Sequence, residues 1–334
     1  MRLRANFAAD AALVTTTLIW GSTFIMAKDI LARWPPVAYL AIRFGLAALV
    51  LLLLFGRELW RGRSAPGLWR AGAVLGLLVG SGFALQAAGQ VYTTASKSAF
   101  VTGLTTPLVP FVAYAMLRVR PNRENLIGVV LASIGGMLIL LPQGAGAVNE
   151  GDLLTLAATG LFAAHITLMS RYTRRYAVRQ LTVLQVLTAA LVFLLVWAGA
   201  HAGAASMQAS ALPQFLVREA RPLAWDGRIA WQLVYLALVG TLGAFFLWTW
   251  GQARMSATHA AIIFSLEPVF ATAFAVAVRG AGEWMGGRGY VGAALVFAGI
   301  VVSELRLTGQ GSRRKADGLR QTEEGRQLEL PSDI

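Results

Sequence analysis

The sequence predicts an all-α transmembrane protein, and three observations carry this prediction. The chain of 334 residues is 57% hydrophobic and only 13% charged, too little charge to cover the surface of a soluble domain of this length. The apolar residues come in long continuous runs, which are typical of lipid-facing helices. The connections between the runs are mostly short and rich in Arg, Gly, Pro and Asn.

A bilayer core requires about 20 apolar residues per helix. By this criterion the sequence predicts ten transmembrane helices, at 11–31, 37–56, 68–90, 96–117, 124–142, 151–171, 180–200, 230–252, 258–279 and 287–306. The first run is too long for the core of a signal peptide, so we interpret it as an uncleaved spanning helix.

The net charge of +13 is explained by the positions of the basic residues. They lie between the apolar runs and are more frequent on the side that holds the N-terminus, so the positive-inside rule places both termini in the cytoplasm. No basic patch interleaved with aromatic residues and no nucleic-acid motif is present, so we expect no nucleic-acid partner. The absence of cysteine excludes disulfides and thiolate metal sites.

The two halves of the chain resemble each other. IRFGLAALVLLLL from Ile42 matches LQVLTAALVFLLV from Leu184, an offset of 142 residues that also pairs Trp20 with Phe162. Later matches with a longer offset pair Gln86 with Trp248, Gln90 with Gln252, Pro107 with Pro268, and Gly128 and Gly135 with Gly292 and Gly299. Chance alignment of apolar residues is the alternative, but matched Gly, Gln and Pro positions in one order favour a repeat.

The repeat predicts three parts of the chain. Residues 1–145 form a first five-helix repeat, 146–306 a second, and 307–334 a polar cytoplasmic tail that we expect to be disordered. An odd number of helices inverts the second repeat relative to the first. Inverted repeats typically place a substrate site at their interface near the membrane midplane.

Several segments carry a family resemblance. They are LIWGSTFIMAK, PPVAYLAIRF, AAGQVYTTASKSAFVTGLTTPLVP, GTLGAFFLWTWGQARMSATHAAIIFSLEPVF, Gly282-Glu283 and YVGAALVFAGIVVSEL. Their order and spacing, from about residue 11 to 306, resemble the EamA-type family of the drug/metabolite transporter superfamily. The resemblance implies ten helices in two inverted repeats that carry metabolites across the bacterial inner membrane, often outward. The family's Gly-Glu after the fourth helix is replaced here by RVRPNRE, where Glu124 fills that place loosely.

Glu267 is the foremost candidate for a substrate-binding residue. It falls near the middle of the predicted helix 258–279, just before Pro268. A charged group at the centre of the bilayer costs about 2.5–3.5 kcal/mol on insertion scales, so its presence suggests function. The proline loosens the helix there, and Glu267 then binds a cationic or zwitterionic substrate or carries a coupling proton. The alternative is a structural glutamate, protonated or bonded to a neighbouring helix.

Pro107 and Pro110 occupy the mirrored place in helix 96–117. With Pro268 they predict helix breaks at corresponding positions of the two halves, which is a pointer to a binding site. A packing kink is the alternative for each proline.

Further polar residues inside the predicted helices are candidates for the lining of the site. Arg43 holds a substrate carboxylate, pairs with Glu267, or extends to the outer headgroups; its repeat partner is Gln185. Gln86 and Gln90 share one helix face and either line a polar cavity or bond between helices. His165 suits proton coupling by its titration range, with a satisfied hydrogen bonder as the alternative. Trp20 lies mid-helix and either stacks on substrate or packs in the core.

The sequence therefore predicts a secondary transporter that exports a small organic molecule, an amino acid or drug-like compound, by alternating access, with proton coupling as an option. The three histidines (His165, His201 and His259) have no metal-ligand spacing, and no G-x-S-x-G motif or P-loop is present. We expect no enzymatic activity, no metal and no cofactor, membrane lipid as a partner, and a monomer or homodimer. A membrane-embedded enzyme acting on lipid and a non-transporting sensor are the alternatives.

Overall fold

The computed structural model describes residues 2–118, 120, 123–140, 149–206, 214–254, 260, 263–264, 266–280 and 286–304. All regular structure in these ranges is helical. The predicted tail at 307–334 and the Gly282-Glu283 segment lie outside the described residues.

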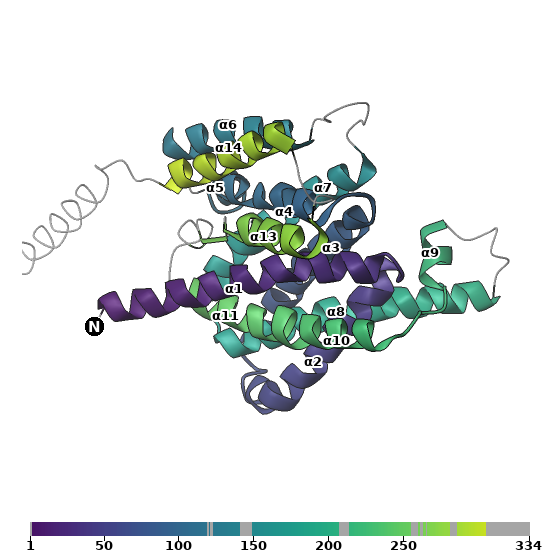
Figure 1. The fold of residues 1–334 in the computed structure, drawn as a ribbon. Coiled ribbons are helices and arrows are strands. Elements are labelled where there is room, and N and C mark those ends of the chain that lie inside the picture. Colours follow the sequence, from purple (N-terminus) through teal and green to yellow (C-terminus); the bar gives the residue numbers. More distant parts are fainter. Residues whose placement is uncertain are drawn as a thin grey trace, which may run out of the picture.

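The helices form one bundle (Figure 1). In chain order they are α1 (Arg2–Leu31), α2 (Pro36–Arg61), α3 (Leu68–Tyr92), α4 (Ala95–Gly103), α5 (Thr105–Leu117), α6 (Arg123–Leu140), α7 (Glu150–Tyr172), α8 (Val178–Ser206), α9 (Gln214–Glu219), α10 (Gly227–Ala237), the π-helix η2 (Leu238–Gly243), α11 (Ala244–Gln252), α13 (Glu267–Arg279) and α14 (Gly286–Glu304).

The prediction of an all-helical membrane protein is confirmed. Within the described ranges, seven stretches are long and apolar enough to cross a membrane: Phe7–Leu31, Pro36–Arg61, Leu68–Tyr92, Ala95–Leu117, Glu150–Tyr172, Val178–Gly203 and Gly227–Gln252. The other three predicted segments fall on the shorter described helices α6, α13 and α14. Ten spans stay a prediction.

Side-chain caps set several helix starts. Asn149 and Asp152 form a reciprocal capping box at the start of α7. Asp226 accepts from the N–H of Ile229 at the start of α10. At α2 the cap comes from a distant segment, because the buried carboxylate of Glu219 accepts from the N–H groups of Val37 and Ala38. These polar contacts satisfy backbone donors that would otherwise be unpaired at the helix ends.

Glycines let α3 approach α8 closely in the centre of the bundle. A Cβ atom on Gly76 would lie 2.5 Å from Cβ of Thr188 and 2.6 Å from the carbonyl oxygen of Gln185. On Gly80 it would lie 3.2 Å from Cβ of Ala189. The G-x-x-x-G of α3 therefore packs helices within this chain.

Two pairs of helices that the repeat treats as equivalent pack against each other in antiparallel orientation. In the pair α6–α14, a Cβ on Gly135 would meet the backbone of Gly292 and Val296, and one on Gly299 would meet that of Gly128 and Ala132. The two helices lie side by side at one edge of the bundle (Figure 1).

The pair α2–α8 lies deeper in the bundle and has the same antiparallel sense. Glu58, near the end of α2, contacts Arg179 and Gln180, near the start of α8. Gly45, in the first half of α2, approaches Leu194, in the second half of α8. A residue late in one helix thus meets a residue early in the other.

The predicted helix break in 96–117 is present, but it lies at Leu104, between α4 and α5. Pro107 falls in the first turn of α5, where its missing N–H removes no helical hydrogen bond, and Pro110 lies inside the helix. Pro268 likewise falls in the first turn of α13. Glu267 is therefore the first residue of a helix, whereas the sequence placed it in the middle of one, and most of 255–265 lies outside the described residues.

Candidate functional site

A small cavity of about 60 Å³ lies between α1, α3, α4, α5, α7, α11 and α13. Its walls come from both halves of the chain. It is lined by Trp20, Thr23, Phe24, Phe83, Gln86, Thr102, Gly103, Thr105, Thr106, Phe162, Ile166, Trp248, Phe264 and Glu267. We call this space the central cavity.

Glu267 supplies the carboxylate of the central cavity. The start of α13 fixes its backbone, and Pro268 packs against Gly103, whose Cβ position would lie 3.3 Å from Cγ of the proline. The side chain is half-buried, and no described residue forms a hydrogen bond or ion pair with it. An acidic group that faces a cavity without a protein partner is available to a ligand.

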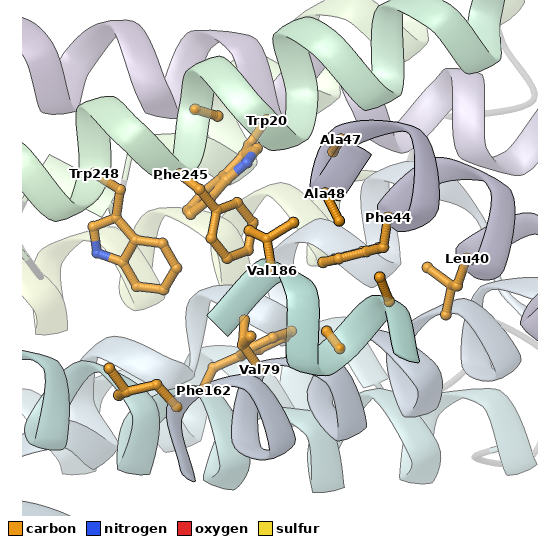
Figure 2. Packing of buried hydrophobic residues seen from close by; sticks show 14 of the residues in the cluster. Trp20, Leu40, Phe44, Ala47, Ala48, Val79, Phe162, Val186, Phe245 and Trp248 are labelled. Carbon is orange, nitrogen blue, oxygen red and sulfur yellow. The ribbon is translucent and has the colours of Figure 1, made fainter. Parts of the chain in front are cut away.

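Aromatic rings form much of the wall. The Trp20 ring meets that of Trp248 edge-on, with centroids 5.0 Å apart, and lies 5.8 Å from that of Phe264. The Phe83 and Phe162 rings meet edge-on at 5.5 Å on another side. Figure 2 shows Trp20 and Trp248 gathered around Phe245, which packs behind them. The edge-to-face contacts hold the rings in fixed orientations.

The π-helix η2 holds the Trp20 ring in its place in the cavity wall. In this turn the carbonyl oxygen of Gly240 accepts a hydrogen bond from Nε1 of Trp20 at 3.0 Å and another from Nη2 of Arg43 at 3.3 Å. The absence of a side chain on Gly240 leaves room for Thr23, whose methyl carbon would be 2.9 Å from a Cβ there. π-Helical turns recur at functional sites, and this one positions a ring of the cavity wall.

Arg43 is buried and does not line the cavity. Its guanidinium donates from Nε to Oγ1 of Thr241 and from Nη1 to the hydroxyl of Tyr39, each at 2.8 Å. It lies 5.1 Å from the centroid of Phe83, whose ring lines the cavity. The predicted pairing of Arg43 with Glu267 is not formed. Arg43 instead joins α2 to η2.

Arg43→Lys should lower the melting temperature of the purified protein. An ammonium cannot span the three acceptors that the guanidinium fork reaches, so buried acceptors lose their donors at a cost of about 2 kcal/mol or more. Arg254→Lys is the matched control, because Arg254 is exposed and donates to the carbonyl oxygen of Trp250, in the helix that ends just before it. Equal melting temperatures for the two variants would contradict the positioning role of Arg43.

The two glutamines of α3, Gln86 and Gln90, have different surroundings. Gln86 lines the central cavity and donates to Oγ1 of Thr102 at 2.9 Å. Gln90 is buried beside the cavity and donates to the carbonyl oxygen of Phe24 at 2.9 Å. One glutamine therefore faces the cavity, and the other joins α3 to α1.

His165 and Gln185 are both fully buried and contact each other. Nε2 of His165 lies 2.8 Å from Oε1 of Gln185, whose amide nitrogen donates to Oγ1 of Thr249 at 3.2 Å. The His165 ring lies 4.6 Å from that of Trp248, which lines the cavity. These residues form a layer behind the wall.

Most of the lining was not singled out in the sequence, although the repeat held a usable signal. Trp20 and Phe162, and Gln86 and Trp248, are the pairs that the repeat offsets align, and all four residues line the cavity. The first offset also pairs Phe24 with Ile166, and the Pro107–Pro268 offset pairs Thr106 with Glu267. These four also belong to the lining. Applying the repeat offsets to the candidates Trp20, Gln86 and Glu267 would have found Phe162, Trp248 and Thr106.

A second and larger hollow lies farther along the same helices. We call it the basic hollow, because Lys28, Lys97 and Arg279 line it together with Val91, Tyr92, Thr93, Thr94 and Asn149. Lys28 is about 12 Å along α1 from Trp20. Buried Phe24, Ala99 and Ala271 lie between the two hollows. The basic hollow is open, and its cations have protein partners, so we take the central cavity as the candidate site.

Comparison with known proteins places this geometry in a family. The EamA-like transporter family model matches residues 7–141 and 149–305. An uncharacterized transporter of Archaeoglobus fulgidus is 28% identical over 90% of this chain and 86% of its own. The uncharacterized transporter YetK of Bacillus subtilis is 27% identical over 91% and 89%.

Two further similarities are consistent with this family match. The uncharacterized inner membrane transporter YedA of Escherichia coli strain K12 is 31% identical over 50% of this chain and 57% of its own. A solved crystal structure superposes with a TM-score of 0.61 at 18% identity over 89% of this chain and 96% of its own, which shows a shared fold. Since the family model matches nearly the whole chain, this multi-pass membrane protein belongs to the EamA-like transporter family.

Proposed function

We propose that the protein is a secondary transporter that moves a small organic molecule through the central cavity by alternating access. The main support for this proposal is that four pairs of repeat-equivalent residues line this cavity. A site built from both halves can pass its ligand from one side to the other when the halves rock. Family membership supports transport over catalysis.

We further propose ten spanning helices in two inverted repeats. The antiparallel contacts of α6 with α14 and of α2 with α8 support inversion, because a two-fold axis in the membrane plane reverses the direction of each helix that it relates. The mirrored contacts of Gly135 and Gly299 support such an axis directly. The positive-inside rule then places both termini in the cytoplasm and the basic hollow outside.

The inner membrane of a bacterium is the proposed location, supported by the relative named an inner membrane transporter. We propose export, with the cavity carboxylate of Glu267 as the group that would carry a coupling proton. No energy-supplying nucleotide motif occurs in the sequence, which favours a gradient as the driving force.

Reconstitution into proteoliposomes tests the function. A mixed pool of metabolites is supplied, and uptake and counterflow are measured at two transmembrane pH differences. We expect saturable accumulation of a subset of compounds, and a dependence on the pH difference if a proton is exchanged. Folded protein that moves none of them would contradict the proposal, and product formation in detergent without a gradient would favour an enzyme.

A further inference from the structure

We propose that the central cavity selects organic cations with an apolar body and rejects anions and zwitterions. This inference rests on the proposed transport function and names the substrate class of the same site. It follows from the charge of the lining, from the aromatic walls, and from the positions of the nearest basic side chains.

The lining carries one acid and no base among the residues that the structure describes. Glu267 is the acid, and the other thirteen residues are neutral. The undescribed residues within 255–265, which precede Glu267 in sequence, include His259 but no lysine or arginine. A carboxylate that has no partner among the described residues, in a largely apolar cavity, favours a ligand that brings positive charge.

The basic side chains nearest to the cavity form hydrogen bonds with other groups of the protein. Arg43 lies behind the Phe83 ring and donates to Tyr39, Thr241 and Gly240. These N–H groups thus bond within the protein, and the Phe83 ring separates the guanidinium from a ligand in the cavity.

The cations of the basic hollow have partners as well. Lys97 pairs with Asp152 at 2.7 Å, Arg279 pairs with Asp29, and Lys28 donates to the carbonyl oxygens of Gln90 and Val91. A ligand carboxylate in the central cavity would therefore face Glu267 without a cationic partner.

The walls suit the rest of such a ligand. Trp20, Phe83, Phe162, Trp248 and Phe264 enclose the space from several sides. A cation over an aromatic face is attracted by the ring quadrupole, most strongly when water is excluded. The hydroxyls of Thr23, Thr102 and Thr105, which also line the cavity, accept hydrogen bonds from ammonium N–H groups.

A zwitterion is the nearest competing class, because the start of α5, at Thr105 and Thr106, lies in the lining and helix N-termini attract carboxylates. That attraction is weakened here. The preceding helix α4 ends only one residue earlier and occupies the space along the axis of α5. The ligand's amine at Glu267 would also hold its carboxylate close to the carboxylate of the protein.

Three ligands that share a phenylethyl group separate these classes. Phenethylamine is a cation at neutral pH, phenylalanine adds only a carboxylate, and 3-phenylpropionate is an anion. Binding of each to the detergent-purified full-length protein is measured by titration calorimetry. We expect phenethylamine to bind at least about tenfold more tightly than either of the others.

Glu267→Gln should remove this preference, whereas Glu58→Gln should keep it. Glu58 is an exposed acid on α2 that pairs with Arg179 and lines neither hollow. Tighter binding of phenylalanine or 3-phenylpropionate than of phenethylamine to the unmodified protein would overturn the inference, whatever the variants do. The inference would also be overturned if the Glu267→Gln protein kept the same preference for phenethylamine as the unmodified protein.

Flux in proteoliposomes separates this inference from the transport function. Glu267-dependent counterflow of phenylalanine without counterflow of phenethylamine would overturn the proposed substrate class but would still support the transport function. Selective binding of phenethylamine to a folded protein that exchanges no ligand would do the reverse.

Discussion

Glu267→Gln is expected to abolish transport and leave the folded protein intact. Glutamine has nearly the same shape as glutamate, and no described residue of the protein relies on the carboxylate for a hydrogen bond. The substitution removes the acidic group of the cavity lining, so both the attraction for a ligand cation and the capacity to carry a proton are lost. Transport rates should fall at least about 100-fold, equivalent to a little under 3 kcal/mol.

Counterflow and gradient-driven uptake of the same substrate are measured side by side on Glu267→Gln, with Glu58→Gln as the carboxylate-to-amide control. Loss of both activities indicates that Glu267 binds substrate. Loss of gradient-driven uptake alone indicates a proton carrier, because exchange needs no net proton movement. Unmodified transport rates would remove Glu267 from the mechanism, and a changed melting temperature would indicate a structural role.

The second large effect is expected at the crossing of α6 and α14. A methyl group at Gly135 would lie 2.4 Å from the carbonyl oxygen of Gly292 and 2.6 Å from the amide nitrogen of Val296, and backbone atoms cannot rotate away. Gly135→Ala should therefore force the helices apart at a cost of about 1–3 kcal/mol. This exceeds the gain of about 1 kcal/mol from the higher helix propensity of alanine.

A glycine-to-alanine substitution at an uncrowded position should not destabilise the protein. Gly160 in α7 has nothing within 4 Å of its Cβ position, so Gly160→Ala should stabilise the protein or leave it unchanged. Gly299→Ala should match Gly135→Ala, since its Cβ would lie 2.5 Å from the carbonyl oxygen of Gly128. Melting temperatures of the three variants in one detergent provide the comparison. A stable Gly135→Ala protein would show that the crossing tolerates a wider separation.

The membrane helices were predictable because a run of about 20 apolar residues has few other stable solutions. The break in helix 96–117 was predicted from Pro107 but lies at Leu104. A proline fits the first turn of a helix, so the break precedes it. The π-helix gave no signal, because LVGTLG is as apolar as its surroundings and the extra residue per turn is stabilised by Trp20 and Arg43 from other helices.

The candidate site was predictable in part. Trp20, Gln86 and Glu267 line the cavity, whereas Arg43, Gln90, His165 and Gln185 are buried around it. Hydropathy cannot separate these groups, since a polar side chain is equally unfavourable in lipid whether it serves a ligand or another helix. The aromatic residues of the wall were hidden for the converse reason, because apolar residues are expected throughout a membrane protein.

The π-helix also sets the rotational phase of its own span. Successive residues of an α-helix advance by about 100° around the axis, so the additional residue in η2 turns everything after it by about that angle. α10 buries Ile229, Leu233 and Leu236, while α11 directs Trp248 into the cavity wall. In a continuous α-helix that buried the same face of α10, Trp248 would point well away from the cavity. The composition of the wall is thus encoded in residue spacing, and deleting one residue between 238 and 243 would alter it more than substituting any single ring.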